Sequence, residues 1–231
     1  MYSEFPVNTK NTTGQVMMLI EYDAGHIDPS DDKNKKIVRE FQMLEHGQIP
    51  DRLVVYVVLQ KYNVKNRNGR IYPERILRVQ NEAYQEAIRQ RRAVGELDHP
   101  ESSVISGERV SHNIIKTWWE GHTLVGEMEI LMTKGYQQSG IVSTSGDKVA
   151  ELLRHNIMIG VSSRGLGSLK EENGSFIVQD DFEIICWDVV TAPSTPGSWI
   201  FKDRAEAAPF VENYVKKGQN LNEGLDKFLL D

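Results

Sequence analysis

The chain has 231 residues, of which 39% are hydrophobic and 26% are charged, a composition typical of a globular protein with a substantial core. Its net charge of −6 argues against a general polyanion-binding surface, because such a surface needs a basic excess. The single cysteine, Cys186, excludes an internal disulfide and favours a reducing compartment. No segment approaches the about 20 apolar residues of a membrane span, and MYSEFPVNTK lacks the layout of a signal peptide. We therefore expect a cytoplasmic protein with no membrane partner and no specific nucleic acid.

The first half of the chain predicts two strands and one helix. VMMLIEY (residues 16–22) and LVVYVVLQ (residues 53–60) are rich in apolar and β-branched residues, which favours strands. Pro73 suits the first turn of a helix, which we expect to continue to Arg92. The apolar residues expected on its inner face are Ile76, Val79, Ala83 and Ala87.

The second half of the chain is richer in strands and carries one short helix. SGDKVAELLRHN (residues 145–156) predicts the helix, with Ser145 or Asp147 as its cap. Strand and hairpin patterns cover AVGELDHP at 93–100, 113–132, IMIGVSSRG at 157–165, 168–178 with a turn at Asn173-Gly174, and FEIICWDVVTAP at 182–193.

The chain divides into three regions by composition. Residues 1–50 are mixed and predict a partly structured segment, and residues 51–202 carry the strand and helix patterns of a β-rich α+β domain. Residues 203–231 are polar and helix-prone, which predicts a flexible tail.

Two adjacent serines lie in GVSSRGLGSL (residues 160–169). Because alternate side chains of a strand share a face, Ser163 falls with the preceding apolar residues and Ser162 falls with Arg164. A serine acts as a nucleophile only if a base reaches it and donors hold the oxyanion. Ser162 is therefore the candidate nucleophile, with Arg164 and the amides around Gly165 as candidate oxyanion donors. From the local sequence alone, a polar turn in which both serines bond the backbone is the competing interpretation.

His99 in GELDHP is the candidate base. It precedes Pro100, which holds its backbone extended, and Glu96 and Asp98 are close enough in sequence to orient it. A metal site made of these three side chains is a weaker alternative, because no second cluster of His or Cys has ligand spacing. His112 is a competing base.

Asp188 is the candidate partner of the base. Alternation through FEIICWDVV places it on an otherwise apolar face with Cys186, where a carboxylate is costly unless it is paired. An imidazole would be a natural partner, as in a catalytic triad. A turn cap or an ion pair with an arginine is the alternative. Cys186 itself is expected to be a buried strand thiol.

Four blocks in order resemble the prohead core protein proteases of large contractile-tailed bacteriophages of the T-even type. The blocks are NRNGRIYPERIL, GELDHP, IIKTWWEGHTLVGE and GDKVAELL…GVSSRGLGSL, and DVVTAPSTPGSW extends the likeness to cover residues 50–200. The resemblance implies a serine endopeptidase in the host cytoplasm, inside the prohead core. It implies that scaffold or core proteins, the major capsid protein and then the protease itself are cleaved. It also implies a barrel-like β core surrounded by helices, similar to herpesvirus assembly proteases.

The resemblance also assigns residues by motif. The family's catalytic histidine lies in the block matched by GELDHP, which is His99, and its nucleophile is the first serine of GVSSRG, which is Ser162. The third catalytic residue does not carry over: Asp188 is the candidate, with Glu96 or Asp98 behind it. No metal or other cofactor is expected, and the oligomeric state is left open.

Proteases of this family are expected to cut after a glutamate that follows an aliphatic residue by two positions, and before a small residue. Leu221-Asn222-Glu223 followed by Gly224 has this pattern, which predicts self-cleavage after Glu223. A pocket for glutamate needs a cation, and Arg67 and Arg70 in the NRNGR block are candidates. Two other classes of function compete: a non-catalytic scaffold component, and an anion-binding module whose GVSSRGLG loop forms a phosphate nest.

Overall fold

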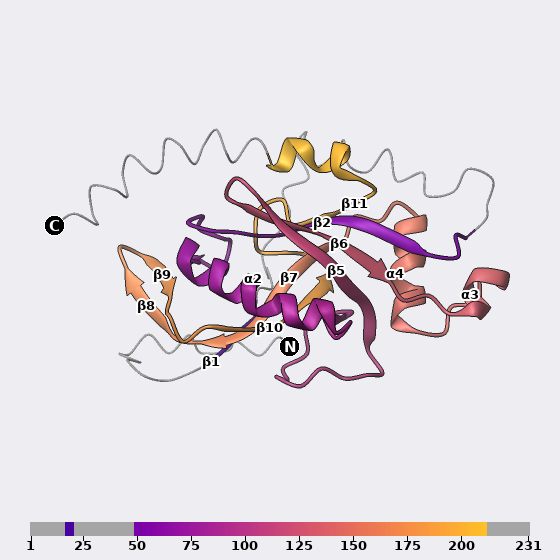
Figure 1. Ribbon diagram of the computed structural model, residues 1–231, viewed down its shortest axis with the longest axis horizontal. Coiled ribbons are helices and arrows are strands. Elements are labelled where there is room, and N and C mark those ends of the chain that lie inside the picture. The colour runs from indigo at the N-terminus through magenta and orange to yellow at the C-terminus, as the bar shows by residue number, and fades with distance from the viewer. Residues whose placement is uncertain (1–16, 21–48, 212–231) are drawn as a thin grey trace, which may run out of the picture.

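The computed structural model describes the backbone of residues 17–20 and the whole of residues 49–211 (Figure 1). Strands dominate these residues and form three β-sheets, and helices lie on the outside of the sheets (Figure 1). The class is therefore α+β, as predicted. No helix in the described ranges is long and apolar enough to cross a membrane.

A five-stranded sheet forms the centre of the molecule, with the order β11-β2-β6-β5-β4. Its strands are β2 (Leu53–Lys61), β4 (Val94–Glu96), β5 (Val110–Glu120), β6 (Thr123–Ile130) and β11 (Ile200–Phe201). Strand β2 is buried along almost its whole length, as its β-branched run predicts. The β5–β6 hairpin was also predicted, and it turns where Gly121 adopts a φ of 58°.

A second sheet carries the serine pair. Strand β7 (Gly160–Gly167) lies between β1 (Met17–Ile20) and β10 (Glu183–Val190), antiparallel to both. A third, small sheet consists of β3 (Arg70–Ile71), β9 (Ser175–Val178) and β8 (Leu169–Glu172). Its β8–β9 hairpin turns at Asn173-Gly174 with φ values of 48° and 70°, which is the predicted turn.

The two larger sheets enclose the main apolar core. Val57 and Leu59 of β2 pack in one cluster with Val161 of β7 and with Trp187 and Val189 of β10. The sheets meet through isolated bridges, one between Leu97 and Val189 and one between Gly160 and Trp199.

The expected barrel-like closure of the core is wrong. Single bridges do not make a continuous hydrogen-bonded ladder, so the sheets remain separate and the described residues form no closed barrel.

Helix α2 (Glu74–Arg89) begins directly after Pro73, as predicted. It buries Ile76, Leu77 and Tyr84, whereas Val79 is 53% exposed and Ala83 is exposed too, so the predicted inner face is wrong at these two positions. The helix is turned so that Tyr84 reaches the main core.

Two short helices, α3 (Lys134–Ser139) and α4 (Ser145–Arg154), lie together at one end of the molecule (Figure 1). The cap of α4 is Thr144, not Ser145 or Asp147 as predicted. Asp147 instead stands at the third helical position and completes a capping box with Thr144.

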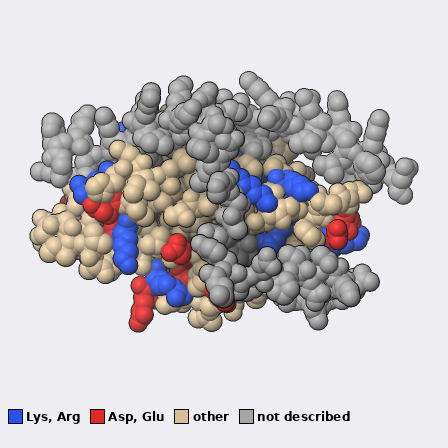
Figure 2. Space-filling view, turned by 180° about the vertical axis from the view of Figure 1, so that it is seen from behind, with Lys and Arg blue, Asp and Glu red and all other residues tan. Residues whose placement is uncertain are grey.

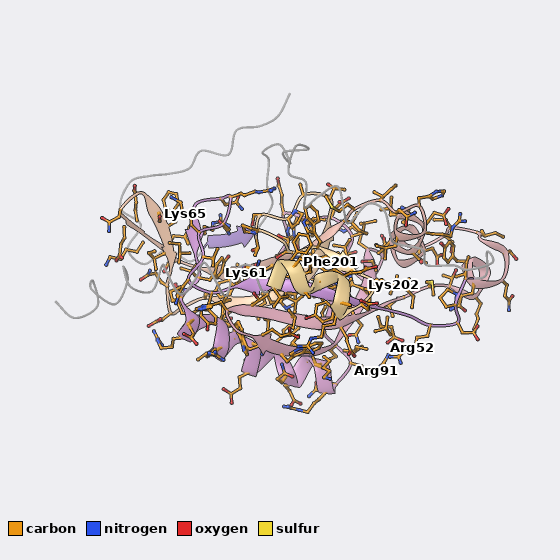
Figure 3. All side chains as sticks on the ribbon, turned by 90° about the horizontal axis from the view of Figure 1, so that it is seen from above. Arg52, Lys61, Lys65, Arg91, Phe201 and Lys202 are labelled. Carbon is orange, nitrogen blue, oxygen red and sulfur yellow. The ribbon has the colours of Figure 1, made fainter. Side chains whose placement is uncertain are left out.

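Residues 204–211 form a helix, although the sequence predicted a flexible tail from residue 203. Ala207 and Val211 are buried in a cluster with Val58 of β2 and Phe201 of β11. Figure 3 shows this helix over the central sheet, with Lys61 and Phe201 beside it. The buried Lys61 donates from Nζ to the carbonyl of Phe210 at 3.0 Å, which ties this helix to β2.

The described charges are mixed in sign. On the face seen in Figure 2, lysine and arginine side chains lie among aspartate and glutamate side chains at several places.

Candidate active site

The pairing of β7 with β10 forms the centre of the candidate site. The register places Ser162 directly opposite Asp188. Residues opposite each other in an antiparallel pair point to the same face, with Cβ atoms about 4.5–5.5 Å apart. Both residues are buried, with 3% of Ser162 and 0% of Asp188 exposed. The hydroxyl and the carboxylate therefore share a closed face of this sheet.

The adjacent Ser163 faces the other way. It lies opposite Trp187, and its hydroxyl accepts a hydrogen bond from Gln60 Nε2 at 3.4 Å. The alternation that separated the two serines in the sequence is therefore confirmed. GVSSRGLG is an extended strand, paired with β10 on one side and partly with β1 on the other, so the alternative of a phosphate nest at this segment is wrong.

His99 reaches the same carboxylate. Its Nδ1 lies 2.8 Å from Asp188 Oδ2, and its side chain is only 4% exposed. The chain after β4 runs beside β10, because Leu97 bridges to Val189 and the amide of Asp98 donates to the Val189 carbonyl at 2.8 Å. This path carries His99 to Asp188.

The other ring nitrogen of His99, Nε2, is buried and has no hydrogen-bond partner within the described structure. A neutral imidazole that donates from Nδ1 to a carboxylate has a free lone pair on Nε2. That tautomer can accept a proton from a hydroxyl.

Asp188 is held in its ionised form. Burial by itself raises the pKa of this carboxyl, but the hydrogen bond and charge of His99 oppose it. The amide of Glu96 donates to Oδ1 at 2.9 Å, and Arg164 Nε lies 2.9 Å from Oδ2. Together these groups lower the pKa of Asp188 below its ordinary value.

Arg164 is fully buried behind this carboxylate. Besides Asp188, its guanidinium contacts Glu96 Oε2 at 3.1 Å, the Ser102 carbonyl at 2.8 Å and Cys186 Sγ at 3.1 Å. Because its donors are directed to these partners, the predicted role of the Arg164 side chain as an oxyanion donor is not supported. The backbone amides of Arg164 and Gly165 stay predictions for that role.

The structure distinguishes the three carboxylates considered as partners of His99. The Glu96 carboxylate contacts Arg164, the Ser106 amide and Arg109. Asp98 is exposed. Only Asp188 has a described hydrogen bond to His99. No group of three or more His, Cys, Asp or Glu side chains arranged to hold a metal occurs in the parts of the chain that the structure describes.

His112, the competing base, is held inside the fold by hydrogen bonds to both of its ring nitrogens. It is fully buried, with Nδ1 2.9 Å from Ser111 Oγ and Nε2 2.8 Å from the Trp187 carbonyl, and burial lowers its pKa to about 4. Both ring nitrogens are engaged, so neither is available to a serine.

The same contact explains the glycine of GELDHP. A Cβ on Gly95 would lie 1.9 Å from the Trp187 carbonyl oxygen and 2.5 Å from His112 Nε2. Only glycine lets β4 approach β10 this closely, and that approach positions the segment that carries His99.

A β-bulge in β10 changes the predicted faces of that strand. The register shifts between Ile184 and Cys186, so strict alternation from Phe182 to Val190 fails. Cys186 and Asp188 still share one face, as predicted, and the bulge separates only the residues before Cys186 from it. That face is polar because Arg164 and Ser162 of β7 lie opposite Cys186 and Asp188. Cys186 is a buried thiol, as predicted, and burial raises its pKa.

Several predicted residues lie away from this centre. Arg67 lies in a loop that leads into β3, and Arg70 is the first residue of β3. Asn66 organises this loop, because its Oδ1 accepts from the Arg70 amide at 2.9 Å. The Arg67 amide donates to the Ser194 carbonyl at 3.1 Å, which joins this loop to the segment after β10. The predicted cleavage site at Glu223-Gly224 lies outside the described residues.

A carboxylate–imidazole pair beside a buried hydroxyl is the arrangement that serine hydrolases use. The sequence pattern of the family described as prohead core protein serine protease matches residues 30–208. The prohead core protein protease of Enterobacteria phage T4 is 32% identical over 151 residues, which are 64% of this chain and 68% of that relative. The solved structure of the bacteriophage T4 capsid assembly protease matches with a TM-score of 0.57 at 25% identity and covers 76% of this chain and 97% of the other.

The chain therefore belongs to the prohead core protein serine protease family. The family that the four blocks of sequence indicated is confirmed, and the coarse function that follows is that of a capsid maturation protease. The expected likeness to herpesvirus assembly proteases stays a prediction.

Proposed function

We propose that this chain is a serine endopeptidase of the phage prohead, with Ser162 as nucleophile, His99 as base and Asp188 as the group that orients the base. One observation carries the proposal. The Asp188 carboxylate contacts His99 Nδ1 at 2.8 Å and stands opposite Ser162 in the β7–β10 register. The buried Nε2 of His99 has no other partner in the described structure.

In the proposed mechanism, Ser162 Oγ attacks the carbonyl carbon of the scissile bond while His99 Nε2 takes the hydroxyl proton. Collapse of the tetrahedral intermediate breaks the C–N bond, and His99 returns the proton to the leaving amine. A water molecule then attacks the acyl-enzyme and gives a proton to His99. Release of the acid returns that proton to Ser162 Oγ. Asp188 stays ionised throughout and stabilises the imidazolium. Backbone amides near Gly165 are the proposed oxyanion donors.

The proposed substrates are the scaffold or core proteins, the major capsid protein and the chain itself, cleaved after glutamate inside the prohead in the host cytoplasm. The glutamate preference follows from the family resemblance, and Leu221-Asn222-Glu223 before Gly224 supplies a matching site in this chain. Arg67 and Arg70 are the proposed cations of the glutamate pocket. Their loop is joined to the segment that follows β10, the strand of Asp188.

The test compares the full-length chain with the variants Ser162→Ala and Ser163→Ala. Ser163 is the matched control, since it is the same residue type one position away on the opposite face. Mass spectrometry follows the release of residues 224–231, and a fluorophosphonate probe, which forms a P–O bond to an activated serine and expels fluoride, reports the nucleophile directly.

Wild type and Ser163→Ala are expected to react with the probe and to release the peptide, whereas Ser162→Ala does neither. A chain that labels at Ser162 but keeps its C-terminus refutes the self-cleavage site and leaves the protease assignment standing. If wild type neither labels nor cuts scaffold protein supplied beside it, the non-catalytic scaffold function is correct instead.

A further inference from the structure

A buried group of fixed charges lies directly behind the proposed catalytic residues. Arg164 on β7 and Glu96 on β4 form an ion pair of 3.1 Å, and both side chains are 0% exposed. We propose that Arg164 and Glu96 act together as a positioning pair that sets the orientation and charge of Asp188 and, through it, the basicity of His99. This inference rests on the proposed function, because it assumes that His99 activates Ser162.

The Arg164–Glu96 pair contacts both oxygens of the Asp188 carboxylate. Arg164 uses two nitrogens, with Nε 2.9 Å from Oδ2 and Nη2 3.2 Å from Oδ1. Glu96 adds its backbone amide, which donates to Oδ1 at 2.9 Å. A two-point contact from a planar guanidinium fixes the plane of a carboxylate. Since Oδ2 is also the atom that contacts His99 Nδ1, that plane decides the direction of the imidazole.

The same pair holds the segment that follows His99. Arg164 Nη1 donates to the Ser102 carbonyl at 2.8 Å. Glu96 Oε1 accepts a hydrogen bond from the Ser106 amide. The histidine therefore lies between Glu96 at one end and a loop anchored to Arg164 at the other. Both partners of the His99–Asp188 contact are positioned by one buried ion pair.

The charges explain why Arg164 alone would be unsuitable. A guanidinium against Asp188 attracts the same carboxylate that must stabilise the imidazolium, so by itself it weakens the base. Glu96 supplies a compensating negative charge at 3.1 Å from that guanidinium. With Glu96 present, Arg164 orients Asp188 while the group as a whole keeps a net negative charge toward His99.

The other titratable groups packed around Asp188 do not carry this charge. They come from α2, β5 and β10: burial raises the pKa of Tyr84 and Cys186 and lowers that of His112 to about 4, so all three are uncharged near neutral pH. Arg109, 48% exposed, lies 3.6 Å from Glu96 at the edge of the group. Arg164 and Glu96 are thus the buried fixed charges next to the Asp188 carboxylate in the described part of the chain.

The test measures the second-order rate of fluorophosphonate labelling of Ser162 against pH in the full-length protein. The acidic limb of this profile reports protonation of the base. The variants are Glu96→Gln, Arg164→Met and the double variant, with Arg109→Gln as the control at the edge of the group.

The two single variants are expected to move the acidic limb in opposite directions. Glu96→Gln removes a negative charge, disfavours the imidazolium and moves the limb to lower pH by about one unit. Arg164→Met removes a positive charge, favours the imidazolium and moves the limb to higher pH by about one unit. The double variant returns the limb close to wild type, and Arg109→Gln changes it little because solvent screens that charge.

If the ion pair has only a structural role, the variants melt at lower temperatures and the acidic limb stays at the wild-type pH in each of them. That result overturns the inference. Limbs that move in the same direction also overturn it. If Arg164→Met does not fold, Glu96→Gln alone decides the matter, since an acidic limb in Glu96→Gln that stays at the wild-type pH is sufficient to refute the inference. If Ser162→Ala labels as fast as wild type, the proposed nucleophile fails, which is a separate outcome.

Discussion

Replacing Asp188 by asparagine would exchange one acceptor oxygen of the carboxylate for an NH₂ group, which can only donate hydrogen bonds. Both oxygens of Asp188 face donors in the structure. Oδ2 meets His99 Nδ1 at 2.8 Å and Arg164 Nε at 2.9 Å. Oδ1 meets the Glu96 amide at 2.9 Å and Arg164 Nη2 at 3.2 Å. Whichever way the asparagine turns, its NH₂ group is opposed by at least two N–H donors.

Two effects follow for Asp188→Asn. If the NH₂ faces His99, the imidazole must present a lone pair from Nδ1, so Nε2 carries the proton and cannot act as a base. Loss of the orienting carboxylate in the trypsin triad lowers the rate by about 10⁴, and a similar loss is expected here. The change also leaves Arg164 with one carboxylate partner fewer in a buried site. Breaking a buried ion pair costs about 3–5 kcal/mol, so the free energy of unfolding should fall by a comparable amount.

Fluorophosphonate labelling of Ser162 and urea unfolding measure the two effects on the same sample. Asp98→Asn is the matched control, because Asp98 is an exposed aspartate one residue before His99. The control should label at the wild-type rate and unfold at the wild-type midpoint. Labelling of Asp188→Asn within tenfold of wild type, in folded protein, would refute the role given to Asp188.

Three further predictions concern the supports of the site and the fold. Gly95→Ala should prevent stable folding or lower the melting temperature strongly, because its Cβ would lie 1.9 Å from the Trp187 carbonyl oxygen; an unchanged melting curve would contradict the close approach of β4 and β10. Asp147, despite its burial, has its pKa lowered to about 2 by hydrogen bonds from Thr133, Ser143 and Thr144. The stabilisation that the ionised Asp147 gives to the folded protein is therefore complete above the ordinary pKa near 4. It is lost as the pH falls toward about 2. The stability–pH profile of Asp147→Asn should lack this change. Val79→Ser should change the unfolding midpoint little while Leu77→Ser lowers it, since Val79 is 53% exposed and Leu77 is 3% exposed.

Local patterns predicted much of the secondary structure because they depend on neighbours in sequence. The Asn173-Gly174 turn follows from residues that tolerate positive φ, and the start of α2 follows from Pro73. The separation of Ser162 from Ser163 follows from the two-residue period of a strand. The same rule failed in β10, because the bulge before Cys186 resets the period. A bulge depends on pairing with another strand, so the sequence of β10 carried no evident signal for it.

The tail boundary and the face of α2 were mispredicted for a related reason. Residues 203–231 as a whole are polar enough to suggest a tail, yet Ala207 and Val211 fit an apolar surface made by β2 and β11. The inner face of α2 is set by where Tyr84 enters the core rather than by its apolar residues alone. In both cases the deciding surface comes from distant parts of the chain.

The sequence by itself determined the family, through four ordered blocks, and identified Ser162, His99 and Asp188 as candidates from strand alternation, the motif and the cost of an unpaired carboxylate. Only the tertiary structure decided which carboxylate His99 contacts. Glu96 and Asp98 are its neighbours in sequence, but the backbone directs Glu96 to Arg164 and leaves Asp98 exposed, while Asp188, 89 positions away, lies at 2.8 Å. The structure also showed that Arg164 binds buried carboxylates instead of facing a substrate. Both results depend on strand pairing between segments that are distant in sequence. A buried charge without a partner is costly, and the partners of these buried groups lie on other strands of the fold.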